Sequence, residues 1–181
     1  ICRDSDVETG RTYRASDARE LRDMIAAATA NDIALEPRAG GSKAAIGCEG
    51  RERAIVDLTA ICGIVDYEPG ELVLSVRPAT PLAEVEALLD ANEQMLAFEP
   101  WDHGGLFGRP SGKATIGGVF AAGVAGPRRL SAGGARDHLL GFSAISGRAE
   151  AFKAGGKVVK NVTGYDLPKV MVGSWGQLAI M

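Results

Sequence analysis

The spacing of apolar residues predicts a helix near the start of the chain. Four of them recur at intervals of three and four residues, as on one face of a helix: Leu21, Met24, Ile25 and Ala28. Asp17 followed by Glu20 resembles a capping box, in which side chains bind the unpaired N–H groups of the first turn. We therefore expect a helix over residues 17–30.

Short apolar runs bounded by turn residues predict strands. Residues 33–38 ("IALEPR") and 54–58 ("AIVDL") are two such runs. In residues 63–78 a Pro-Gly pair separates two β-rich runs, which predicts a hairpin. Pro81 marks the start of a second amphipathic helix, and residues 94–100 ("QMLAFEP") predict a further strand. Helices and strands thus alternate over the first half of the chain, which indicates an α+β or α/β fold.

The second half differs in composition. Residues 101–134 keep neither a helical nor a strand period, and they hold ten of the 24 glycines. Within them, residues 114–129 ("ATIGGVFAAGVAGPRR") are rich in Gly and Ala and end in two cations. Small residues allow another helix or a ligand to approach the backbone closely. A helix packed on a sheet would explain the alanines, whereas a ligand would explain the succession of "TIGG" and "GPRR".

Residues 36–47 ("EPRAGGSKAAIG") form a second candidate binding segment. Backbone N–H groups that converge in a Gly-rich turn can hold a phosphate, and the adjacent lysine would strengthen that binding. The alternative is a tight connection between two strands, in which the glycines only turn the chain. The segment taken alone favours that alternative, so the rest of the chain has to distinguish between the two.

Composition and charge exclude several classes of protein. The chain has 181 residues, of which 46% are hydrophobic, and its net charge of −3 is spread without a basic stripe that could follow a nucleic acid. Its three cysteines, Cys2, Cys48 and Cys62, are too irregularly spaced for a disulfide scaffold or a zinc site. No apolar run is long enough to cross a bilayer, and the first residues do not resemble a signal peptide. We therefore expect a cytoplasmic protein.

Familiar nucleotide-binding and catalytic motifs are missing from the sequence. It contains no G-x-G-x-x-G and no G-x-S-x-G. Residues 108–114 ("GRPSGKA") have three residues between the glycines where a Walker A loop needs four, and Ala114 replaces the Ser or Thr that would bind magnesium. No cluster of His, Cys, Asp or Glu has the spacing of a metal site. A bound phosphate would therefore lie between two Gly-rich segments about seventy residues apart.

Four segments, in this order, resemble the FAD-binding domain of the vanillyl-alcohol oxidase/p-cresol methylhydroxylase (PCMH-type) superfamily: "PRAGGSK", "ATIGGVFAAGVAGPRR", "RDHLLG" and "KNVTGYDLPKVMVGSWGQLAIM". "GPRR" and "KNVTGYDL" are most similar to the FAD-binding (E) subunits of bacterial glycolate oxidases. The resemblance covers residues 13–181 and implies an α+β domain of two lobes, about 13–76 and 77–181, with the cofactor between them. Relatives continue beyond "GQLAIM" with a substrate-covering cap domain, which is absent from this sequence.

The resemblance also implies which residues surround the FAD. Some relatives attach the flavin to a His in the "PRAGGS" turn, but the corresponding residues here are Gly40, Gly41 and Ser42, so binding is expected to be non-covalent. The backbone of this turn would hold the diphosphate, and the other residues would line the cofactor. The complete set is Arg38, Ala39, Gly40, Gly41, Ser42, Lys43, Pro100, Thr115, Ile116, Gly117, Gly118, Ala122, Gly126, Gly164, Tyr165, Asp166, Ile180 and Met181.

For function, the resemblance implies a flavin-dependent oxidoreductase that passes electrons from a small hydroxy acid, such as glycolate, to an acceptor. Its partners would be a sister flavoprotein subunit and an iron–sulfur subunit, which could also hold it at the inner membrane. The alternative is a non-catalytic flavin-fold subunit that serves as an electron relay or as an assembly surface. Tyr165 and His103 are possible bases, but such residues are more often structural, so no catalytic residue is assigned.

Overall fold

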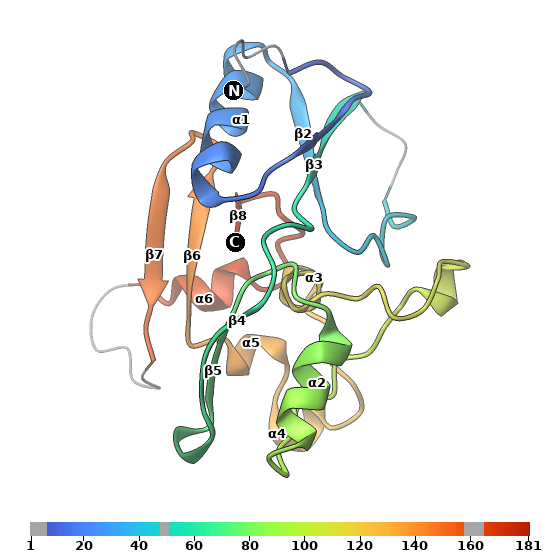
Figure 1. Cartoon of the computed structure of the whole chain (residues 1–181), viewed down its shortest axis with the longest axis vertical. Coiled ribbons are helices and arrows are strands. Elements are labelled where there is room, and N and C mark those ends of the chain that lie inside the picture. The colour runs from blue at the N-terminus through green and yellow to red at the C-terminus, as the bar shows by residue number, and fades with distance from the viewer. Residues whose placement is uncertain (1–6, 48–50, 158–164) are drawn as a thin grey trace.

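The computed structural model describes residues 7–47, 51–157 and 165–181 (Figure 1). Its strands form three separate sheets, one parallel and two antiparallel. This mixture of sheets, connected by helices and long loops, confirms the predicted α+β fold class. Within the described ranges no helix is both long enough and apolar enough to cross a membrane.

The first sheet is parallel and has the spatial order β1 (Thr12–Arg14), β3 (Arg53–Asp57) and β2 (Ala34–Arg38). Helix α1 (Ala18–Ala30) connects β1 to β2, and β3 then inserts between these two strands. β2 and β3 coincide with the two predicted strands. The carboxyl end of β2 leads directly into the Gly-rich segment, which therefore leaves the sheet at one edge (Figure 1).

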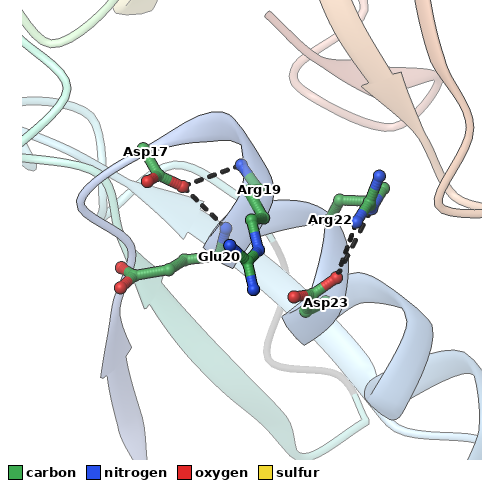
Figure 2. A network of polar contacts seen from close by, with 5 residues as sticks. All are labelled: Asp17, Arg19, Glu20, Arg22 and Asp23. Atoms are coloured by element: carbon green, nitrogen blue, oxygen red, sulfur yellow. Dashed lines mark hydrogen bonds and ion pairs between the residues drawn. The ribbon is translucent and has the colours of Figure 1, made fainter. Parts of the chain in front are cut away.

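Asp17 caps the N-terminus of α1, as the sequence predicts. Its carboxylate oxygen Oδ1 accepts hydrogen bonds from the backbone N–H groups of Arg19 and Glu20, each at 2.8 Å (Figure 2). The Glu20 carboxylate accepts from the backbone N–H of Ser16 at 2.8 Å, one residue earlier than in a standard capping box. Two donors of the first turn that have no partner within the helix are thereby satisfied.

We expect Asp17→Ala to lower the free energy of unfolding by about 1 kcal/mol, because the variant leaves those two N–H groups without their acceptor. Urea denaturation followed by circular dichroism measures the change. Asp23→Ala is the matched control: Asp23 lies on the exposed side of the same helix and pairs with its neighbour Arg22 at 3.2 Å (Figure 2). Its effect should stay below about 0.5 kcal/mol. Equal losses in the two variants would contradict the capping role.

The predicted hairpin consists of β4 (Ile64–Glu68) and β5 (Val73–Val76), which pair antiparallel. Their connection is a short 3₁₀ segment, η1 (Pro69–Glu71), that ends at Leu72 in the left-handed region, with φ of 56°. Helix α2 (Leu82–Asp90) follows Pro81, also as predicted. The hairpin and α2 pack on a common core.

The strand predicted for residues 94–100 is wrong. The backbone N–H of Gln94 donates to the carbonyl of Leu89 at 2.9 Å, and Glu93 has φ of 56°, so these residues cap the C-terminus of α2. Glu99 has φ of 49°, so the backbone cannot remain extended. Phe98 is completely inaccessible to solvent, whereas Met95 of the same segment is 55% exposed, so the apolar residues do not follow the alternation of a strand.

The third sheet has the order β7 (Ala151–Gly155), β6 (Gly141–Ser146) and β8 (Ala179–Ile180), all antiparallel. The remaining elements are short and lie in the glycine-rich second half. They are η2 (Gly105–Phe107), α3 (Ile116–Ala122), α4 (Arg129–Ala132), α5 (Ala135–His138) and α6 (Leu167–Met171).

Two apolar clusters hold these elements together. In the first, Leu21 and Ile25 of α1 pack with Val56 of β3 and with Ile145 of β6. The second combines buried residues of α2 and α3 around Phe98, with the β4–β5 hairpin packed against them. Because β6 belongs to the first cluster, the proposed two lobes share core residues, and the boundary near residue 76 stays a prediction.

Candidate functional site

The Gly-rich segment forms a tight turn after β2. Arg38, the last residue of the strand, forms an ion pair with Glu36, with 2.5 Å between Nη2 and Oε1. Residues 42–45 then turn, and the N–H of Ala44 donates to the carbonyl of Gly41 at 3.1 Å. Gly41 has φ of +69° and no atom within 4 Å of the position that a Cβ would take. The turn therefore needs glycine for its conformation and is open on that side.

Four consecutive donors in this turn are unused. Within the described part of the chain, the backbone N–H groups of Gly40, Gly41, Ser42 and Lys43 donate to no acceptor. Ser42 is only 6% exposed, while Gly40, Gly41 and Lys43 are partly exposed, so a ligand can reach these donors from the open side of the turn. Successive unpaired backbone N–H groups in a turn can bind an anion.

The second Gly-rich segment lies directly against this turn. A Cβ on Gly40 would be 1.5 Å from the carbonyl oxygen of Lys113, so only glycine allows the two backbones to approach this closely. Figure 1 shows the loop that follows β2 and the long loop before α3 on the same side of the molecule. The two segments expected to hold one phosphate, about seventy residues apart in sequence, are thus neighbours in space.

Lys43 supplies a positive charge at the same place. Its Nζ atom lies 3.4 Å from Ser42 Oγ and 4.0 Å from the position that a Cβ would take on Gly118. No carboxylate of the described residues lies within 4.0 Å of it. Burial lowers the pKa of Lys43, while Asp102 acts in the opposite direction. A half-buried ammonium without an ion pair favours a bound anion.

The first turn of α3 contributes in a different way from the turn after β2. The N–H of Gly117 donates to the Pro78 carbonyl at 2.8 Å, and that of Gly118 donates to Thr115 Oγ1 at 3.3 Å. Ile116 likewise donates to the carbonyl of Thr80. These amides are already occupied, so this segment can line a ligand by contact but has no unpaired N–H groups to offer it. The interpretation of residues 114–129 as a close-packed helix is confirmed for the stretch that forms α3.

Pro100, Ala122 and Gly126 lie along the same half of the molecule. Gly126 is buried and donates its N–H to the carbonyl of Phe98 at 2.8 Å, with no space for a side chain beside Glu99. Pro100 and Gly126 share a groove that also contains Trp101 and Arg128. Ala122 is the last residue of α3. Pro100 and Gly126 thus line a groove, whereas Ala122 is not among its lining residues.

The C-terminal segment contacts β2 and α3. A Cβ on Gly176 would be 2.9 Å from Pro37 Cγ, next to the end of β2, and the N–H of Trp175 donates to the carbonyl of Ala121 in α3. Ile180 pairs with Ile145 in the third sheet, and Met181 packs on the cluster formed by Ala144, Met171 and Ala179.

The described "GYDL" residues Tyr165 and Asp166 directly precede α6, and their place beside the cofactor stays a prediction. Tyr165 is 91% exposed, and Asp166 pairs with Lys169 at 3.0 Å at the start of α6. Gly164 lies outside the described residues. The ring of His103 lies against that of Trp101, with centroids 3.8 Å apart and a tilt of 32°, and burial together with the nearby Lys43 lowers the pKa of His103. In the described part of the chain, no three His, Cys, Asp or Glu residues are arranged to hold a metal ion.

Sequence reasoning missed one residue of the site, Asp102. Its carboxylate accepts hydrogen bonds from the N–H groups of Gly104, Gly112 and Lys113, which lie at both ends of the loop before α3. An Asp two residues before a glycine is a signal for such a local turn. The bonds to Gly112 and Lys113 close a longer loop, however, and no local pattern indicates them.

This turn fits the diphosphate of a dinucleotide, because it has four unpaired N–H groups, a lysine, and open space beside Gly41. Consistent with this, the chain matches the FAD binding domain family over residues 11–155. It is 38% identical over 164 residues to glycolate oxidase subunit GlcE of Escherichia coli K12, a match that covers 91% of this chain and 45% of that protein.

Two further comparisons agree with the match. The chain is 27% identical over 168 residues to a D-lactate dehydrogenase of Archaeoglobus fulgidus, covering 93% of this chain and 36% of that protein. Its fold is that of alkyldihydroxyacetonephosphate synthase, with a TM-score of 0.72 at 18% identity over 93% of this chain and 29% of the other. The chain thus spans less than half the length of each of these relatives. It belongs to the FAD-binding domain family, and its cofactor is FAD.

Proposed function

We propose that this chain is the FAD-binding portion of a flavin-dependent oxidoreductase that oxidises a small 2-hydroxy acid, as a subunit of a glycolate oxidase type of enzyme. The similarity to glycolate oxidase subunit GlcE and to a D-lactate dehydrogenase supports this substrate class, because glycolate and lactate are both 2-hydroxy acids. FAD, when bound, supplies the redox chemistry, and the protein holds and orients it.

The observation that carries the proposal is the turn at Gly40–Lys43. Its unpaired N–H groups and the Lys43 ammonium would hold the diphosphate, while Thr115–Gly118 would cover it by contact. We place Pro100, Ala122 and Gly126 along the rest of the cofactor. Contacts from Gly164, Tyr165, Asp166, Ile180 and Met181 remain part of the proposal. No residue in this set is assigned to proton transfer.

A second candidate is a flavin-fold subunit without turnover of its own, which relays electrons or assembles a catalytic sister subunit. The relative GlcE is named as one subunit of its enzyme, which favours this alternative. In either case the proposed partners are a sister flavoprotein and an iron–sulfur subunit, in the cytoplasm or at the inner membrane through those partners. Addition of glycolate distinguishes the two functions. Loss of about half or more of the 450 nm absorption band of bound FAD would support the catalytic function, and an unchanged band would support the relay.

FAD titration followed by flavin fluorescence tests the binding function. We expect saturable binding by the wild type and about tenfold weaker binding by Lys43→Met, which loses a charge-assisted contact to the diphosphate. Lys153→Met is the control, because Lys153 is an exposed residue of β7. Wild-type protein that fails to bind FAD would contradict the proposed function. Equal affinity of wild type and Lys43→Met would contradict only the role of Lys43.

The pH dependence of the titration identifies the lysine. An anion prefers the protonated form, so affinity is highest below the pKa of Lys43 and falls as the pH rises through it. Burial places this pKa below the ordinary value of 10.5, so the fall begins at a lower pH than for an exposed lysine. Lys43→Met should lack this component, and any titration of FAD itself appears in both proteins.

A further inference from the structure

Asp102 closes the exposed loop that precedes α3. Its Oδ1 atom accepts from the N–H of Gly104 at 2.8 Å, and its Oδ2 atom accepts from the N–H groups of Gly112 at 2.7 Å and Lys113 at 3.2 Å. The loop between these donors contains η2 and is exposed along most of its length. One carboxylate therefore fixes both ends of a segment that buries little apolar surface of its own.

The peptide of Lys113 connects Asp102 to the Gly-rich turn, because its N–H and its carbonyl have different partners. Its carbonyl oxygen occupies the place where Gly40 would carry a side chain, 1.5 Å from the ideal Cβ position. The N–H of Lys113 donates to Asp102, and the carbonyl of Lys113 contacts the turn at Gly40–Lys43, which we call the diphosphate turn. Any shift of the loop end would thus move the wall against which the turn of Gly40–Lys43 rests.

The charge of Asp102 acts in the opposite direction. A carboxylate near the Lys43 ammonium weakens the positive potential that an anion would experience, and it raises the pKa of Lys43 against the effect of burial. Burial would raise the pKa of Asp102 itself, but the backbone donors around it hold that pKa below its ordinary value of 3.8. Asp102 therefore remains charged. Its negative charge taken alone would disfavour the binding of an anion beside Lys43.

We propose that Asp102 is a positioning residue for FAD, which orders the diphosphate turn by holding the Lys113 peptide against Gly40. This inference rests on the proposed function. The hydrogen bonds of Asp102 and its charge should have opposite effects on FAD binding. Loss of the three hydrogen bonds should weaken FAD binding, whereas loss of the negative charge alone should strengthen it.

Asp102→Ala tests the inference, because it removes the acceptor of all three N–H groups, whereas the amide oxygen of an Asn could still accept from Gly112 and Lys113. We expect the dissociation constant for FAD to rise about tenfold or more. Asp137→Ala is the matched control, since Asp137 also accepts a backbone N–H, that of Gly134 at 2.8 Å, but at α5. A dissociation constant that stays equal or falls in Asp102→Ala would overturn the inference, while failure of the wild type to bind FAD would overturn the proposed function itself.

A second cycle tells whether Asp102 acts through the backbone or through Lys43. In the Lys43→Met background, Asp102→Ala should still weaken binding about tenfold if Asp102 acts through the Lys113 peptide. No additional loss in the double variant would overturn that role. Amide exchange of the wild type without FAD gives a reading independent of any variant. Gly112 and Lys113 should be protected, and free exchange at both would contradict the inference.

Discussion

Gly41→Asp is expected to abolish measurable FAD binding and to leave the fold intact. Gly41 has φ of +69°, a region that Asp tolerates better than most residues, and nothing lies within 4 Å of the new Cβ. The added carboxylate would face the diphosphate and would compete with it for the unpaired N–H groups of the turn. Two unit charges at about 4 Å repel by about 4 kcal/mol at the effective dielectric of a partly buried site, which is about a thousandfold in affinity.

Gly41→Asn isolates this charge effect. Asn has nearly the same shape as Asp and a similar tolerance of positive φ, but it is neutral. We expect Gly41→Asn to lose about tenfold in affinity or less, with both variants melting within a few degrees of the wild type. Fluorescence titration measures the affinity, and thermal unfolding without FAD measures the fold. If Gly41→Asp retained wild-type affinity, this turn would not hold the phosphates.

The second large effect is expected for Gly40→Ala. The new methyl group would coincide with the Lys113 carbonyl oxygen, so the turn and the loop before α3 must separate. Gly40 does not have a positive φ, which means that the effect comes from packing and not from backbone strain. We expect the free energy of unfolding to fall by about 1–3 kcal/mol and the affinity for FAD to fall about a hundredfold.

Gly70→Ala is the control for this substitution. Gly70, in the connection of the hairpin, also lacks a positive φ and has no atom within 4 Å of the position that a methyl group would take. Its replacement should change the free energy of unfolding by less than about 0.5 kcal/mol and leave FAD binding unchanged. Denaturant unfolding and FAD titration of the two variants should be done side by side. Similar behaviour of both variants would indicate that the contact between Gly40 and Lys113 is not maintained.

The elements that the sequence predicts well are those defined by local signals. The helix after Asp17 has an N-cap residue and a repeating apolar face, and the hairpin around Pro69 has a turn pair between two β-rich runs. Residues 94–100 carry the composition of a strand, but Phe98 is buried between α2 and α3. That burial depends on residues distant in sequence, so no local pattern reveals it.

The candidate site divides in the same way. The Gly-rich turn at residues 40–43 could be identified from composition and resemblance. The availability of its N–H groups could not, because the similar amides of Gly117 and Gly118 are occupied by Pro78 and Thr115. The amides of Ile116 and Gly117 are paired because α3 packs against residues 78–80, and that of Gly118 because Thr115 caps the helix. The closure of the loop by Asp102 is likewise a product of tertiary structure.

The position of Ile145 has a consequence for how the chain folds during synthesis. α1 and β3 are made early, but the core between them is completed by a strand from residues 141–146. The apolar face of α1 therefore stays partly uncovered until most of the chain has left the ribosome. Contacts this distant in sequence slow folding and leave hydrophobic surface open to association with other chains. The first half of the domain thus depends on its last sheet for protection from aggregation as well as for stability.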